Sequence, residues 1–172
     1  MVIYCYEDGF KGRDALKHIL GDSQVKALQS DGYNIYMYLD DHMVDIEHLC
    51  CMAHARTKFK YALEQGNDKD ATFILELIGE LYRLEREYEE GKLSPEQIRL
   101  CRNNLKTKEI IIKSRSKLDV LLSDGHPPCG ELMEKTVNYM NTFWTQLFSY
   151  LNDGSYSIDK SIAECFIRPL AQ

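Results

Sequence analysis

The chain has 172 residues, of which 44% are hydrophobic and 28% charged, and its formal net charge is −6. These values are ordinary for a folded protein, and the length suits one domain or a small core that carries an insertion. The acidic balance argues against a chain that binds DNA through a strongly basic surface, whereas a nuclease core can be acidic because its metal ligands are carboxylates. No apolar run approaches the roughly 20 residues of a membrane span and no signal-peptide pattern opens the chain, so we expect a cytoplasmic protein.

The first 66 residues alternate predicted strands and helices. β-Branched and aromatic runs predict strands, and Asp31-Gly32 predicts the turn that ends the second of them. The segment 34–38 is ambiguous, with a short helix favoured. The strands are predicted at 2–6, 25–30 and 48–52, and the helices at 12–20, 34–38 and 53–63. This alternation is typical of an α/β layer structure.

From residue 67 onward the apolar residues recur at helical spacing. One helix is predicted over 71–90. Ser94, Pro95 and Gln97 form a capping-box pattern that predicts a second helix, running unbroken to about Ser123. A third is predicted over 131–151. We therefore predict an α-helical insertion at 67–151 in a core made of 1–66 and 152–172, with Asp159 capping a last helix.

Two acidic residues are candidates for a metal site. Asp31 directly follows a predicted strand, and Glu164 lies in the first turns of the last predicted helix. Two-metal phosphoryl transfer uses carboxylates from separate chain segments, and Mg²⁺ prefers such oxygen ligands. An Asp-Gly pair is more often a plain turn, however, and a Glu near a helix start is usually a surface residue. The residues alone leave both interpretations open.

Four collinear blocks of the chain resemble the catalytic region of bacterial insertion-sequence transposases of the sixty-six family, which are of the aspartate–aspartate–glutamate (DDE) type. The first is Asp31-Gly32-Tyr33, similar to the family's second catalytic aspartate and its Gly-Tyr partner. The second is Cys51-Met52-Ala53-His54-Ala55-Arg56-Thr57-Lys58-Phe59. The third, 76–86, resembles the start of the family's helical insert. The fourth, 158–171, resembles the segment that bears the catalytic glutamate.

The resemblance implies an incomplete RNase-H-like core interrupted by the helical insertion, and a parent activity of Mg²⁺-dependent DNA cleavage and strand transfer. Asp31 and Glu164 would be catalytic metal ligands, and His54, Arg56 and Asp159 supporting residues. The family's first catalytic aspartate lies upstream of the strand that opens this chain. Lys160-Ser161 replaces two asparagines and Cys165 an arginine. We therefore expect a truncated transposase region without detectable strand transfer.

Three further features have competing interpretations. A basic run on the second long helix is either a solvated face or a contact to the DNA backbone, and consists of Lys106, Lys108, Lys113, Arg115 and Lys117. The long helices could instead make the chain a non-catalytic interaction protein, including a homo-oligomer, if an apolar stripe is exposed. A weaker alternative is a zinc site, since histidines and cysteines crowd the segment 48–54, although their spacing fits no standard zinc motif.

Overall fold

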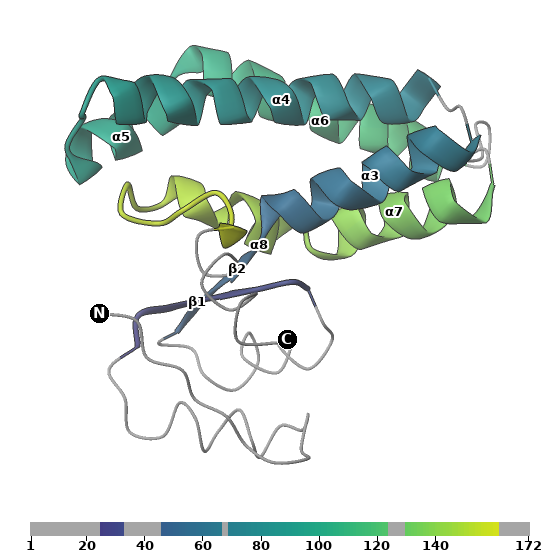
Figure 1. The fold of residues 1–172 in the computed structure, drawn as a ribbon, viewed down its shortest axis with the longest axis horizontal. Coiled ribbons are helices and arrows are strands. Elements are labelled where there is room, and N and C mark those ends of the chain that lie inside the picture. Colours follow the sequence, from purple (N-terminus) through teal and green to yellow (C-terminus); the bar gives the residue numbers. More distant parts are fainter. Residues whose placement is uncertain (1–24, 33–45, 67–68, 124–129, 162–172) are drawn as a thin grey trace, which may run out of the picture.

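The computed structural model describes residues 25–32, 46–66, 69–123 and 130–161. This part of the chain is mostly helical and carries a small sheet of two parallel strands (Figure 1). In chain order the elements are β1 (Ala27–Ser30), β2 (Glu47–Cys50), α3 (Met52–Gly66), α4 (Lys69–Glu90), α5 (Pro95–Arg102), α6 (Leu105–Leu122), α7 (Glu131–Thr142), α8 (Trp144–Phe148) and a 3₁₀ turn, η2 (Ser149–Leu151). The predicted strand 2–6, the predicted helices 12–20 and 34–38, and Glu164 lie outside the described residues.

The two strands pair in parallel, with Ala27 opposite Glu47 and Ser30 opposite Cys50. Both fall within one or two residues of the predicted strands 25–30 and 48–52. The strand–helix unit β1, β2 and α3 agrees with the expected α/β class. Helices nevertheless dominate the described residues, so the α/β prediction is confirmed only in this coarse form.

Long helices form most of the core. α3 packs against α4 and α7, α4 packs against α6, and Figure 1 shows α4 and α6 above α3 and α7, with the strands below. The predicted 3.6-residue spacing is realised, since α4 buries Ile74, Ile78 and Leu81 and α7 buries Met133, Val137 and Met140. No helix among the described residues is long and apolar enough to cross a membrane.

The predicted unbroken helix from Pro95 to Ser123 is wrong. The capping box at Ser94 and Gln97 is present, but α5 ends at Arg102 and α6 begins at Leu105. Asn104 caps the new helix by accepting a hydrogen bond from the Thr107 amide at 2.9 Å. Asn103 donates to the carbonyl of Leu151 at 3.1 Å, so a distant segment stabilises the break. Asparagine favours such local caps over helix interiors.

The predicted single helix over 131–151 is likewise interrupted, at Phe143. Its backbone leaves the helical region (φ −101°, ψ 22°), and the chain continues as α8 and then η2. The Phe143 ring is buried and lies 5.1 Å from the Tyr139 ring, measured between centroids. The break in the helix therefore coincides with packing of the Phe143 ring in the core.

Arg102 anchors the segment that follows η2. Its guanidinium pairs with Glu85 of α4 at 2.6 and 3.0 Å and donates to the carbonyls of Tyr150, Asp153 and Tyr156 at 2.7–2.9 Å. Only 3% of Arg102 is exposed. These bonds hold the returning chain against α4 and α5, from where it leads back to the strands.

Candidate functional site

The carboxyl ends of the two strands form one edge. Asp31 follows β1 directly, and Cys51 and α3 follow β2. The Cys51 amide donates to the Ser30 carbonyl at 2.8 Å, which continues the strand pairing to the end of β1. Since parallel strands end at the same edge of a sheet, the Asp31 turn and the start of α3 lie beside each other.

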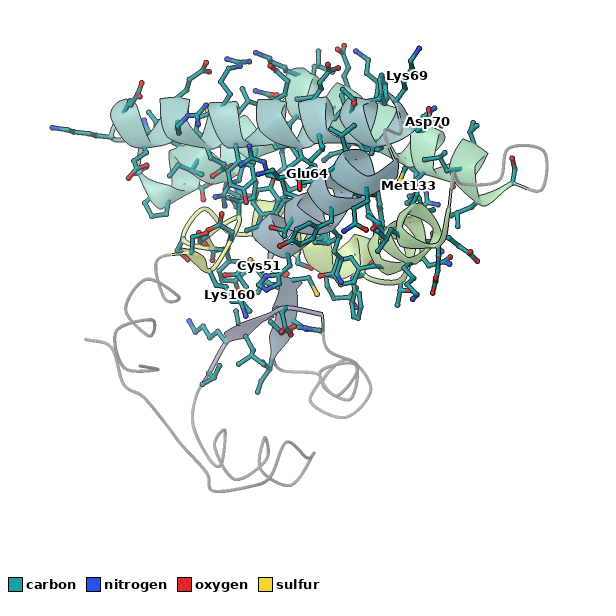
Figure 2. The ribbon with its side chains drawn as sticks, turned by 45° about the vertical axis from the view of Figure 1, so that its right-hand side comes forward. Cys51, Glu64, Lys69, Asp70, Met133 and Lys160 are labelled. Atoms are coloured by element: carbon teal, nitrogen blue, oxygen red, sulfur yellow. The ribbon has the colours of Figure 1, made fainter. Side chains whose placement is uncertain are left out.

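The segment 157–161, which leads toward Glu164, returns to this edge. The Gln29 side-chain amide donates to the Ser157 carbonyl at 3.0 Å, and the Met52 amide donates to the Ile158 carbonyl at 3.1 Å. Figure 2 shows Cys51 and Lys160 close together, and the Lys160 amide lies 3.4 Å from the Cys51 sulfur. The structure thus brings this segment to the strand that carries Asp31, while Glu164 lies outside the described residues.

The Asp31-Gly32 turn has a defined backbone. Gly32 adopts φ +78°, in the left-handed region that favours glycine. The Gly32 amide donates to Ser30 Oγ at 3.1 Å, and the Tyr139 hydroxyl donates to the Asp31 carbonyl at 2.9 Å. Asp31 itself is an exposed residue at the carboxyl end of β1.

A buried polar cluster lies beneath the turn. Ser30 Oγ and His48 Nε2 are 2.8 Å apart, and the Cys50 sulfur lies 3.9 Å from His48 Nε2 and 4.0 Å from Ser30 Oγ. All three residues are buried. The sequence did not identify Ser30 as part of the site, because a serine that ends a strand has no distinctive pattern.

Asp159 is held by two hydrogen bonds to its carboxylate. The Tyr82 hydroxyl donates to Oδ2 at 2.7 Å, and the Ser161 amide donates to Oδ1 at 2.9 Å. Burial, and then the bond to the Asp159 carboxylate, raise the pKa of Tyr82 well above its ordinary value, so Tyr82 remains a donor. The Asp159–Ser161 bond is of the kind made by a residue at a helix start.

The two predicted supporting residues of α3 lie in its first turns. His54 is half-buried, and Arg56 is exposed with its guanidinium 5.5 Å from the centre of the Tyr82 ring. Arg56 and Asp159 therefore contact the same tyrosine. No local pattern singles out Tyr82, because its partners lie in distant parts of the chain.

The zinc alternative has no support in the structure. The segment 48–54 lies wholly within the described residues, and these contain no group of three or more histidine, cysteine or acidic side chains that could hold a metal ion. His48 and Cys50 instead point into the buried cluster with Ser30.

The basic run on α6 is divided between two environments. Lys106, Lys108 and Lys113 are exposed. Arg115 pairs with Asp119 and lies 4.9 Å from the centre of the Trp144 ring. Lys117 pairs with Asp70 of α4 at 2.5 Å. Two of the five predicted DNA-contacting residues are therefore engaged in contacts within the chain.

Comparison with known proteins identifies the family. Residues 1–172 match the family described as "Transposase IS66 family", so the chain belongs to this family of transposases. Two proteins of Sinorhizobium fredii (strain NBRC 101917 / NGR234) are similar. The chain is 25% identical to "Uncharacterized protein y4jD" over 173 residues and 30% identical to "Uncharacterized protein y4qI" over 181 residues.

These alignments cover 98% of this chain but only 32% and 31% of the two relatives. The chain therefore spans about a third of the length of the curated relatives that it matches. No solved structure matches it at a significant level.

Proposed function

We propose that this chain forms part of the catalytic region of a DDE transposase, with Asp31 and Glu164 as two of its metal ligands. Residues 1–66 and 152–172 would form the RNase-H-like core and 67–151 the helical insertion. The observation that carries the proposal is the return of segment 157–161 to the carboxyl end of β1, through the bonds from Gln29 and Met52. That segment lies immediately before Glu164.

The donor set suits a hard divalent cation. Asp31, an exposed residue at the carboxyl end of β1, would offer one carboxylate, and Glu164 would add a second from the following predicted helix. Mg²⁺ prefers carboxylate oxygens and retains several waters, which an open edge allows. When bound, such ions would activate an attacking oxygen and stabilise the leaving oxygen in DNA cleavage and strand transfer.

Asp159 has a different role in this proposal. Both of its carboxylate oxygens accept hydrogen bonds, one from Tyr82 and one from Ser161. We therefore assign it to orienting the chain that leads into Glu164, not to the metal. Arg56 lies over the Tyr82 ring and supports the same contact from α3. His54 lies two residues earlier on that helix and is a further supporting residue.

DNA is the proposed partner of the whole protein. Within this chain the candidate contacts to the DNA backbone narrow to Lys106, Lys108 and Lys113, because these lysines are exposed on α6. Lysine contacts of this kind would position a duplex without reading its sequence. Arg115 and Lys117 contribute to helix packing instead.

The test is calorimetric titration of the chain with Mg²⁺ and Mn²⁺, alongside Asp31→Asn and Glu164→Gln. Glu89→Gln, which changes an exposed acid on α4, is the matched control. We expect submillimolar binding that each site variant weakens at least about tenfold, because each removes a charged oxygen ligand. Binding that responds equally to all three substitutions, or no binding, would contradict the proposal.

A second candidate is a non-catalytic interaction role for the helices. α4 and α7 each bury an apolar stripe and expose Phe73 at 40% and Leu132 at 41%, respectively. α6 exposes Leu105, Ile112 and Val120, at 80%, 63% and 48% of their surface. These residues recur at near-heptad spacing, so they form a stripe along one side of α6. This candidate includes self-association of the chain. It would be favoured if metal binding is unchanged by both Asp31→Asn and Glu164→Gln.

A further inference from the structure

Tyr139 connects the helical segment to the Asp31 turn. It lies on α7, far from Asp31 in sequence, and its hydroxyl donates to the Asp31 carbonyl at 2.9 Å. The ring also covers Gly32, since a Cβ added there would lie 2.7 Å from Tyr139 Cε2. Lys58 of α3 contacts the same ring, with its ammonium 4.8 Å from the ring centre.

The peptide unit between Asp31 and Gly32 is held on both sides. Its carbonyl accepts from Tyr139, and its N–H donates to Ser30 Oγ at 3.1 Å. Ser30 Oγ is in turn 2.8 Å from His48 Nε2 in the buried cluster. Fixing both polar groups of one peptide restricts its rotation, and so holds in place the backbone from which the Asp31 side chain projects.

We propose that Tyr139 is a positioning residue for Asp31, through which the helical segment helps to build the metal site. This inference rests on the proposed function, because it concerns Asp31 as a metal ligand. Tyr82 makes the corresponding contact to Asp159 from α4, so both acidic segments of the site contact a tyrosine from the helices. Groups that orient metal ligands through hydrogen bonds typically change metal affinity when they are removed.

The experiment compares Tyr139→Phe with Tyr61→Phe, which changes a tyrosine that is 55% exposed on α3. Phenylalanine keeps the ring, and circular dichroism verifies that each variant is folded. Two quantities are measured for each: Mn²⁺ affinity by calorimetry and hydrogen exchange of the Gly32 amide by NMR. We expect Tyr139→Phe to weaken Mn²⁺ binding about tenfold and to speed exchange at Gly32, with Tyr61→Phe unchanged in both.

The outcomes separate this inference from the proposed function. If the chain binds Mn²⁺ in an Asp31-dependent way and Tyr139→Phe leaves the affinity unchanged, the positioning role is wrong and the proposed site stands. Faster exchange at Gly32 with unchanged affinity would show a packing role only and would also overturn it. If the unaltered chain shows no Asp31-dependent binding, the proposed function and this inference both fail.

Discussion

Arg102 shows how one buried side chain organises distant parts of the molecule. It joins Glu85 of α4 to three backbone carbonyls between Tyr150 and Tyr156, and its guanidinium lies 4.9 Å from the Tyr150 ring centre. A buried charge is stable only when such partners replace water. No local pattern in the sequence indicates this role, because an arginine near a helix end usually faces solvent.

We expect Arg102→Ala to lower the free energy of unfolding by about 3–5 kcal/mol, because it leaves Glu85 and the carbonyls without their donor. Arg102→Lys should recover only part of the loss, since an ammonium cannot reproduce the two-pronged contact. Arg99→Ala, which breaks an exposed pair with Glu96, is the control and should cost less than about 1 kcal/mol. Urea denaturation measures all three, and equal losses at the two arginines would contradict the assignment.

The candidate site also contains both residues that the sequence could indicate and residues that it could not. Asp31 was a candidate from the sequence, because Asp31-Gly32-Tyr33 after a predicted strand resembles a block of the family, and its role stays a prediction. Ser30, Tyr82 and Tyr139 were not candidates, because their hydroxyl groups become relevant only through contacts across the fold.

At the level of elements, helical spacing predicted α4, α6 and α7, and α3 was predicted within the alternation of strands and helices, but neither predicted where the helices break. The unpredicted break after Arg102 coincides with tertiary contacts to the segment 150–156, and the break at Phe143 coincides with burial of the Phe143 ring in the core. Intrinsic helix propensity is weak, and such contacts readily override it. The sequence therefore predicted that these helices exist, but it did not predict where they end.

Alanine substitutions at two glycines should have opposite effects on the stability of the fold. A Cβ on Gly154 would lie 1.8 Å from the carbonyl oxygen of Pro95, at the start of α5, so Gly154→Ala forces backbone to move. We expect it to lower the free energy of unfolding by about 1–3 kcal/mol or more. A Cβ on Gly79, within α4, would meet no other atom within 4 Å. Gly79→Ala should therefore raise the free energy of unfolding by about 0.5–1 kcal/mol.

Thermal denaturation of the two variants, at matched protein concentration, measures these effects. Opposite shifts of the unfolding midpoint would support close contact between the segment after η2 and the start of α5. A Gly154→Ala protein as stable as the parent would show that this contact is not required.

At the level of the whole molecule, buried tyrosines predict a loss of stability at alkaline pH. Burial, with the neighbouring Glu85, raises the pKa of Tyr150 above its ordinary value, and Tyr82 and Tyr139 shift in the same direction. Below about pH 10 tyrosine is neutral in both folded and unfolded states, so stability is unaffected. Above it the unfolded chain releases the proton and the folded chain retains it, so stability falls.

For Tyr150 this fall approaches about 1.4 kcal/mol per pH unit. Denaturation from pH 8 to 11 should give a flat free energy of unfolding that declines beyond about pH 10. Tyr150→Phe keeps the ring and should make the decline shallower. An identical slope in both proteins would mean that Tyr150 titrates alike in the folded and unfolded states.

Local chemistry in the chain was sufficient to predict the long helices, the strands near 25–30 and 48–52 and the capping box, because each depends on residues close together in sequence. The transposase family was indicated by the resemblance of four collinear blocks spread along the chain. The shape of the candidate site depended on tertiary structure. Only folding brings segment 157–161 to the carboxyl ends of the two strands, places Tyr139 and Tyr82 against the two acidic segments, and divides the basic run between solvent and packing. Such contacts join residues that are distant in the chain, and their energies arise from burial and geometry that no local pattern encodes.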